Sequence, residues 1–446
     1  MFVSLLFALV LQSSDASQTR LNDWPVWRGP LATGAAPEAT PPTEWTEARN
    51  IRWKVRVPGD GTASPIVVGD VVFVLTAVDT GRVDPSLPRP EDQPKRVFGI
   101  THPNTTYRFE VHRLDAATGA TVWSKVAFEK IPHEGHHGDA SFASASPVCD
   151  GRRVVAWFGS AGLACYTRDG QQLWTRDLGP AYVGASLGEG ASPALHGDRL
   201  VVVRDQARQS TIHCLDADTG QTIWEHDRDE PNNWATPLIT THAGTTQVIT
   251  AGTNAVRAYR LDDGELLWQC RGLSENVTPS PVRFGDTVIC MSGYQGFSAM
   301  AISLAARGDV TGTDAVVWSL DRDTPYVPSP VLLENRLYVL KSSSGVLSCF
   351  DAATGKTLVP RRRLPETPNI YASPVAANGH VYVCGRNGIT SVFRDDGQLT
   401  LVAHNVLDGR VDASPAIAGD AMYLRTRQFL YCLADEATRD DSATGD

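Results

Sequence analysis

The densest group of chemically active side chains lies in residues 133–139, which read HEGHHGD. Imidazole nitrogens and carboxylate oxygens bind Zn²⁺ and other divalent ions, so His133, His136 and His137 are candidate metal ligands. Their spacing matches no closed zinc motif, and no neighbouring motif would orient the imidazoles. A solvated loop, with packing over the central channel as one arrangement, is the alternative that we favour, and the sequence leaves metal binding here open.

Several sequence patterns typical of enzymes are absent. The chain contains no GxGxxG or P-loop pattern, and no Cys-x-x-Cys-His that would attach a haem. None of the eight cysteines is adjacent to another in the sequence. We expect them to be buried free thiols, and one pair across neighbouring structural units is the alternative that a secreted protein permits.

The elements that position these residues follow from an internal repeat. A Ser-Pro or Thr-Pro pair precedes an apolar run eight times, and successive prolines are separated by 82, 46, 44, 44, 49, 44 and 41 residues. Except for the first, these spacings match one propeller blade. The pairs are Ser64-Pro65, Ser146-Pro147, Ser192-Pro193, Thr236-Pro237, Ser280-Pro281, Ser329-Pro330, Ser373-Pro374 and Ser414-Pro415.

A Gly followed four residues later by Trp recurs in phase with the first motif, as in Gly220 and Trp224. Between the two motifs lie short apolar strands separated by turn residues, so each unit reads as four antiparallel strands with no room for a helix. The chain is therefore predicted to be all-β, an eight-bladed propeller of four-stranded antiparallel blades. Val359 and Leu401 replace the Trp in units six and seven, where we expect lighter packing between blades.

The strand count also predicts how the ring closes. The eighth unit lacks a fourth strand at the C-terminus, and residues 50–57 (NIRWKVRV) supply one, so the N-terminal strand should complete the last blade. Trp24 lies outside the repeats, and we expect it to contribute less to stability than the repeat tryptophans. The predicted divisions are a signal peptide at 1–16, an N-terminal extension at 17–49, the propeller at 50–434 with insertions at 79–106 and 130–142, and a flexible acidic tail at 435–446.

The repeat resembles a known family. The pattern Leu-Asp-Ala-x-Thr-Gly-x-x-x-Trp, as at residues 114–123 and 215–224, is similar to the PQQ-like β-propeller repeat (quinoprotein alcohol dehydrogenase-like) family. That family includes PQQ-dependent dehydrogenases and cofactor-free propellers such as the scaffold subunit of the outer-membrane β-barrel assembly machinery. The dehydrogenases carry a vicinal Cys-Cys disulfide, a Ca²⁺ site and a catalytic Asp. Since no cysteines are adjacent here, the resemblance implies the cofactor-free type, with PQQ and Ca²⁺ as the alternative.

Candidate binding residues follow from the propeller geometry. The first strand of each blade lines the central channel, so residues just before each Ser-Pro pair should surround one mouth. Carboxylates mixed with aromatic rings can hold a cation, a sugar or a peptide end, whereas the structural alternative is that they cap strands and bond the next blade. The candidates are Asp60, Asp139, Glu189, Trp234, Asn276, Tyr326, Tyr371 and Asp412.

Composition and the N-terminus indicate the compartment. The 446 residues carry 40 basic and 50 acidic side chains, a net charge of -10 that argues against a nucleic-acid partner. Residues 2–11 form an apolar run, and small residues before a cleavage point after Ala16 indicate a signal peptide, although its basic start is missing. We expect a secreted or periplasmic monomer with no transmembrane segment once the signal is removed.

The sequence therefore favours a secreted, non-catalytic β-propeller that binds or scaffolds, with cell-envelope or outer-membrane assembly as a process that fits. The alternative is a PQQ- or metal-dependent oxidoreductase with its site at the channel mouth. The protein partner or small ligand and the biological process stay open.

Overall fold

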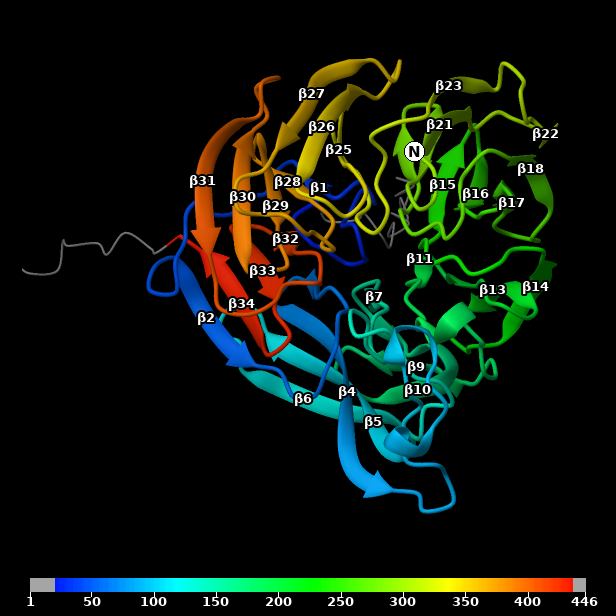
Figure 1. The fold of residues 1–446 in the computed structure, drawn as a ribbon, viewed down its shortest axis with the longest axis vertical. Coiled ribbons are helices and arrows are strands. Elements are labelled where there is room, and N and C mark those ends of the chain that lie inside the picture. The colour runs from blue at the N-terminus through cyan, green and yellow to red at the C-terminus, as the bar shows by residue number, and fades with distance from the viewer. Residues whose placement is uncertain (1–20, 436–446) are drawn as a thin grey trace, which may run out of the picture.

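A computed structural model describes residues 21–435, and the predicted signal peptide and most of the predicted tail lie outside them. The chain forms eight four-stranded antiparallel blades arranged in a ring around a central axis (Figure 1). The all-β, eight-bladed propeller predicted from the repeat is confirmed. No helix within the described residues is long and apolar enough to cross a membrane.

The strands follow the repeat closely. Blades 1 to 4 contain β3 (Ile66–Val68), β4 (Val71–Val83), β5 (Thr105–Asp115) and β6 (Thr121–Lys130); β7 (Val148–Cys149), β8 (Arg153–Trp157), β9 (Leu163–Thr167) and β10 (Gln172–Arg176); β11 (Ala194–His196), β12 (Arg199–Arg204), β13 (Ser210–Asp216) and β14 (Thr222–Arg228); and β15 (Leu238–His242), β16 (Thr245–Thr250), β17 (Val256–Arg260) and β18 (Leu266–Cys270).

Blades 5 to 8 contain β19 (Val282–Phe284), β20 (Thr287–Ser292), β21 (Ser298–Ser303) and β23 (Val316–Leu320); β24 (Val331–Leu333), β25 (Arg336–Leu340), β26 (Val346–Asp351) and β27 (Thr357–Arg363); β28 (Val375–Ala377), β29 (His380–Cys384), β30 (Ile389–Arg394) and β31 (Thr400–Val406); and β32 (Ala416–Ala418), β33 (Ala421–Arg425), β34 (Phe429–Ala434) and β2 (Ile51–Arg56). Short additions are β1 (Ala35–Ala36), β22 (Gly308–Asp309) and the 3-10 turns η1 (Pro90–Asp92), η2 (Val97–Gly99), η3 (Gly159–Ala161) and η4 (Gly184–Ser186).

The ring closes as the strand count predicts. Strand β2 pairs antiparallel with β34, with Ile51 opposite Leu433 and Arg56 opposite Phe429, so the last blade contains both ends of the propeller. In Figure 1 blue β2 lies beside red β34. The pairing covers the edge of β34 that would otherwise be open, and β2 becomes the terminal strand of the blade.

The Ser-Pro motif joins the blades around the axis. The backbone N–H of Ser64 donates to the hydroxyl of Ser146 in the next blade at 3.0 Å, and the same bond recurs through Ser192, Thr236, Ser280, Ser329 and Ser373 to Ser414, at 2.8 to 3.0 Å. Because blades approach one another most closely at the axis, only a small side chain fits there. A hydroxyl also satisfies a buried N–H that no sheet ladder reaches.

The Gly-Trp motif joins the blades farther out. The indole N–H of Trp174 donates to the Ala217 carbonyl of the next blade at 3.0 Å. Corresponding bonds link Trp53, Trp123, Trp224 and Trp318 to the blades that follow them. The motif glycine of the next blade lies against the ring: a Cβ at Gly220 would lie 2.6 Å from Trp174. The Trp of a motif therefore contacts the following blade, whereas the Gly of the same motif contacts the Trp of the preceding blade.

Blades 6 and 7 depart from this pattern as expected from their sequences. Gly397 follows the blade that carries Val359, and a Cβ there would meet nothing within 4 Å. Leu401 occupies the Trp position of blade 7. In the hydrophobic cluster shared by blades 7 and 8, Trp45 of the N-terminal extension stacks on Tyr382. Val359 is nevertheless buried in a hydrophobic cluster with Phe393 and Leu399 of blade 7, so lighter packing between blades 6 and 7 stays a prediction. The extension supplies an aromatic ring to the next gap.

The expectation for Trp24 is wrong. Its side chain is 1% exposed, and its backbone exchanges two hydrogen bonds with Val67. The extension then crosses the end of the ring, where Arg28 donates to the carbonyls of Pro330 and Pro374, and burial lowers the pKa of Arg28 to about 9. The repeat could not reveal this because residues 21–49 contain no copy of it.

All eight cysteines are buried free thiols, as expected from the sequence. Burial raises the pKa of Cys149 to about 12, which keeps its thiol protonated and unreactive. The pairing alternative is thereby excluded for this structure.

Two matched substitutions test the interblade contact. Gly220 and Gly397 have φ of 70° and 73°, so alanine imposes the same left-handed strain at both. Only Gly220→Ala also collides with a tryptophan. We expect Gly220→Ala to lower the free energy of unfolding by about 1–3 kcal/mol more than Gly397→Ala, measured by denaturant titration. Equal losses would show that the glycine is required for its backbone alone.

Candidate binding site at the channel mouth

A cavity of about 470 Å³ lies on the propeller axis. Trp27 of the extension contributes to its lining, and motif hydroxyl residues such as Ser64 and Ser192 surround it. Seven of the eight residues predicted for the mouth line this cavity: Asp139, Glu189, Trp234, Asn276, Tyr326, Tyr371 and Asp412. Asp60 does not line it, because its carboxylate receives both hydrogen bonds of the Arg427 Nη1 group at 2.9 and 3.0 Å.

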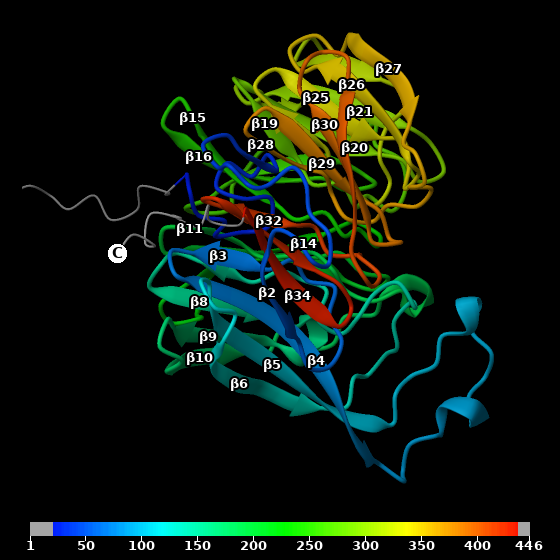
Figure 2. The same cartoon turned by 90° about the vertical axis from the view of Figure 1, so that its left-hand side faces the viewer.

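Aromatic rings form much of the cavity wall. The Trp234 indole donates to the Gly188 carbonyl at 2.7 Å, which fixes the ring. Tyr326 packs against Tyr294 with ring centroids 4.9 Å apart. Phe98, in the projecting β4–β5 connection (Figure 2), is 68% exposed and has a φ of 60°. An exposed aromatic held in a left-handed conformation at a cavity mouth is a candidate contact residue.

The aspartates at the mouth are all paired with arginines. Asp139 contacts Arg386 and Arg410 and accepts a hydrogen bond from the Tyr371 hydroxyl at 2.8 Å. Asp412 accepts hydrogen bonds from Arg386 at 2.8 Å and from Arg427 at 3.0 Å. Three aspartates therefore meet three arginines, and the mouth carries no net charge from them.

These ion pairs fasten the 130–142 insertion across the ring. Arg386 lies between β29 and β30, and Arg427 lies between β33 and β34, so they connect blades 7 and 8 to Asp139 of the insertion. Arg427 also donates to the Asp139 backbone carbonyl at 3.0 Å. The favoured interpretation of the histidine segment is a solvated loop over the central channel, and His137 and Asp139 of this segment do line the axial cavity.

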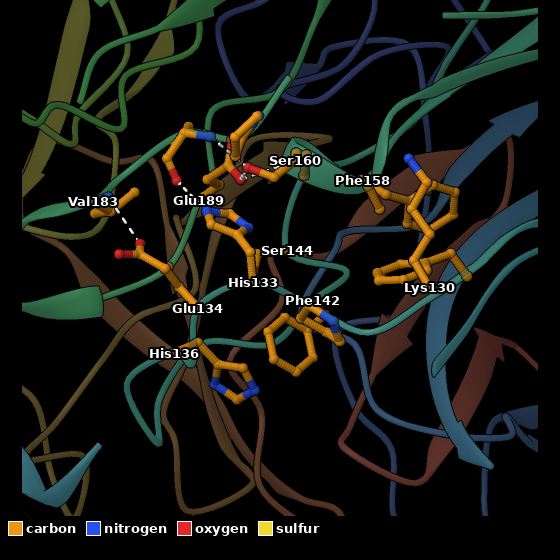
Figure 3. A pocket seen from close by; sticks show the side chains of 18 of the residues that line it. Lys130, His133, Glu134, His136, Phe142, Ser144, Phe158, Ser160, Val183 and Glu189 are labelled. Carbon is orange, nitrogen blue, oxygen red and sulfur yellow. Dashed lines mark hydrogen bonds between the residues drawn. The ribbon is translucent and has the colours of Figure 1, made fainter. Parts of the chain in front are cut away.

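The three histidines point to different partners. The His133 Nε2–H donates to the Ala181 carbonyl at 2.7 Å, and the His136 Nδ1–H donates to the His137 carbonyl at 2.8 Å. Figure 3 shows that His133 and His136 do not face one another. Within residues 21–435 no group of three or more His, Cys, Asp or Glu side chains is placed to hold a metal ion.

Sequence reasoning missed several residues of the site for one reason. Phe98, Tyr294, Arg386 and Arg427 all lie between the second and third strands of their blades. That connection returns to the same face as the segment before the first strand, because antiparallel strands alternate in direction. The predicted strand order could therefore have identified these four residues. No sequence pattern pointed to Trp27, because it lies in the N-terminal extension outside the repeat.

The Asp139 pairing predicts an acid-dependent contribution to stability. Burial alone would raise the pKa of Asp139, but hydrogen bonds from Arg386 and Tyr371 outweigh it and lower the pKa below its usual value. The contribution is therefore present above the unfolded-state pKa of about 4 and is lost as the pH falls through the lower folded-state value. We expect melting temperatures to fall less steeply below about pH 4 in Asp139→Asn than in the unmodified chain. Identical slopes would show that the ion pairs contribute nothing.

Comparison with known proteins agrees with this architecture. The sequence profile of the family described as outer membrane protein assembly factor BamB matches residues 108–359 and 306–433. No curated protein gives a significant sequence match. Among solved structures, BamB from Moraxella catarrhalis is 15% identical with a TM-score of 0.58, and the alignment covers 86% of this chain and 98% of that one.

Two dehydrogenases share the same fold. Quinohemoprotein alcohol dehydrogenase from Comamonas testosteroni is 10% identical with a TM-score of 0.60, covering 95% of this chain and 82% of that one. A europium-containing methanol dehydrogenase is 10% identical with a TM-score of 0.62, covering 92% and 91%. At these identities the structures establish the fold alone, while the profile covers most of the sequence. The chain belongs to the PQQ-like β-propeller family.

Proposed function

We propose that this protein is a non-catalytic binding or scaffolding propeller that engages its partner at the channel mouth. The observation that carries the proposal is the ion-pair network: Asp60, Asp139 and Asp412 are held by arginines rather than left free for chemistry. A carboxylate paired with a guanidinium is a poor general base because proton uptake would break the pair. The network instead makes the mouth rigid.

The lining residues also fit a calcium-bound quinone poorly. Ca²⁺ takes six to eight oxygen ligands, usually including carboxylates. Here Asp139 and Asp412 are paired with arginines, and Glu189 accepts hydrogen bonds from Ser160, which leaves no convergent set of free carboxylates among the residues that line the cavity. We therefore derive no redox step for this chain.

The exposed aromatic residue supports a binding role. Phe98 stands beside His137 at the mouth, with ring centroids 5.1 Å apart, and the cavity behind it is lined by further aromatic side chains. Aromatic residues at the centre of a concave surface are frequent anchors of protein interfaces. The family profile names an outer-membrane assembly factor, which supports a proposed partner in the cell envelope and a proposed location outside the cytoplasm.

A site-specific photo-crosslinker tests the binding surface. Placed at position 98 in the producing cells, it should give one discrete covalent adduct. Leu173, an exposed apolar residue on the outer strand β10, provides the matched control and should give none. The same adducts at both positions, or no adduct at position 98, would contradict a partner at the channel mouth.

Titration with PQQ and Ca²⁺ tests the oxidoreductase alternative. We expect no dye-linked alcohol or sugar oxidation and no rise in melting temperature, because the lining lacks a calcium ligand set and its aspartates are paired with arginines. A ligand at a concentration 100 times its dissociation constant would add about 2.7 kcal/mol to the free energy of unfolding, which is readily detected. Stoichiometric binding with turnover would overturn the proposal.

A further inference from the structure

We propose that a second cavity, between blades 1 and 2, binds a small organic ammonium ion. This cavity of about 200 Å³ lies beneath the 130–142 insertion (Figure 3). Apolar cavities of about 150 Å³ accommodate benzene, so the space suits a ligand of similar size. The proposal does not depend on the function assigned to the channel mouth.

Aromatic side chains make the cavity attractive to a cation. Phe109, Phe142, Trp157 and Phe158 line it, and Phe109 and Phe158 pack edge to face with centroids 5.5 Å apart. An ammonium group is attracted to the negative face of such rings, and its alkyl groups pack against them. The walls therefore suit a cation with a short apolar body.

Glu189 supplies a carboxyl group that is held in place at the cavity wall. Its Oε1 accepts hydrogen bonds from the Ser160 N–H at 2.7 Å and the Ser160 hydroxyl at 2.5 Å. A Cβ at Gly159 would lie 2.6 Å from the same oxygen, so glycine is required for this close approach. The other oxygen, Oε2, has no hydrogen-bond donor anywhere in residues 21–435.

The surrounding charges leave one negative charge uncompensated. Lys130 pairs with Asp177 at 2.8 Å. The other nearby cation is Arg204, which lies over Trp157 and gives its donors to two backbone carbonyls. Counting imidazoles as neutral, the carboxylates of residues 134, 177 and 189 outnumber the two cations by one. Burial raises the pKa of Glu189, the direction expected of a carboxyl group that lacks its counter-ion.

The remaining polar groups of the lining act mainly as acceptors. His133 donates through Nε2 to the Ala181 carbonyl, so in the neutral ring Nδ1 is an acceptor. The Glu134 Oε2 atom accepts from the Val183 N–H at 3.0 Å, which fixes the second carboxylate of the lining. A ligand that donates hydrogen bonds and carries one positive charge matches these groups, whereas an anion does not.

Three probes of equal length test the ligand class: n-butylammonium, n-butanol and butyrate, titrated calorimetrically into the purified full chain. We expect measurable binding of n-butylammonium alone. Butanol binding as tight as that of n-butylammonium would overturn the proposal, because it would show that apolar contact suffices. Absence of n-butylammonium binding would overturn it as well.

Charge-removing substitutions assign the binding to Glu189. Glu189→Gln keeps an oxygen for Ser160 and should weaken n-butylammonium binding at least about tenfold, as expected for loss of a hydrogen bond to a charged group. The matched control is Glu129→Gln on the exposed face of β6, where the carboxylate pairs with Arg82 outside the cavity, and it should leave the affinity unchanged. Equal losses would indicate a general charge effect and refute the site.

Aromatic substitutions locate the ligand. Phe158→Leu alters only the cavity between blades 1 and 2, and Tyr326→Leu alters only the channel cavity. We expect Phe158→Leu to weaken n-butylammonium binding and Tyr326→Leu to leave it unchanged. The reverse result would place the cation in the channel and overturn the proposal. Because the three-probe series uses the unmodified chain, it decides the ligand class even if a variant fails to fold.

Discussion

The structure depends on the hydroxyl hydrogen bonds that run around the axis. Eight sheets arranged radially must converge at the centre, and there each motif Ser or Thr from blade 1 to blade 7 donates its N–H to the hydroxyl of the next blade. Each such bond contributes only about 0.5–1.5 kcal/mol net, but an unsatisfied buried N–H costs more. The motif therefore sets how closely the blades approach and how wide the channel is. The contacts between blades farther from the axis form at the blade spacing that these bonds set.

Farther from the axis the blades diverge, and larger side chains fill the growing gap. The tryptophans do this in most blades, with their glycine partners making room for the rings. Trp268 varies the arrangement: its indole donates to the Gln247 side chain at 3.1 Å, and Gln247 in turn donates to the Leu304 carbonyl of blade 5 at 2.8 Å. The same wedge can therefore be joined by a relay of side chains, which shows that filled space and satisfied donors matter more than residue identity.

The sequence predicted what repeats and little of what does not. Blade number, strand order and ring closure follow from motifs that recur at a fixed spacing, because each copy folds by the same local rules. The burial of Trp24 and Arg28 depends on contacts with blades 1, 6 and 7 that no local pattern encodes. Most of the predicted mouth residues do line the cavity, yet their chemistry was unforeseen, since the arginines that pair with Asp60 and Asp139 are distant in the sequence. The positions of the mouth residues follow the repeat, whereas their ion-pair partners do not.

Ring closure through β2 and β34 has a consequence for biosynthesis. Ile51 cannot pair with Leu433 until the C-terminal strand has been synthesised. At usual translation rates of about 5–20 residues per second, the time between synthesis of the two residues is on the order of tens of seconds. During that time Trp53 and its strand have no partner within blade 8. The last blade cannot be completed while the chain is still emerging, so it forms only after synthesis of the C-terminal strand. A chain delivered whole across a membrane before it folds would never present the half-built blade to the crowded ribosome exit.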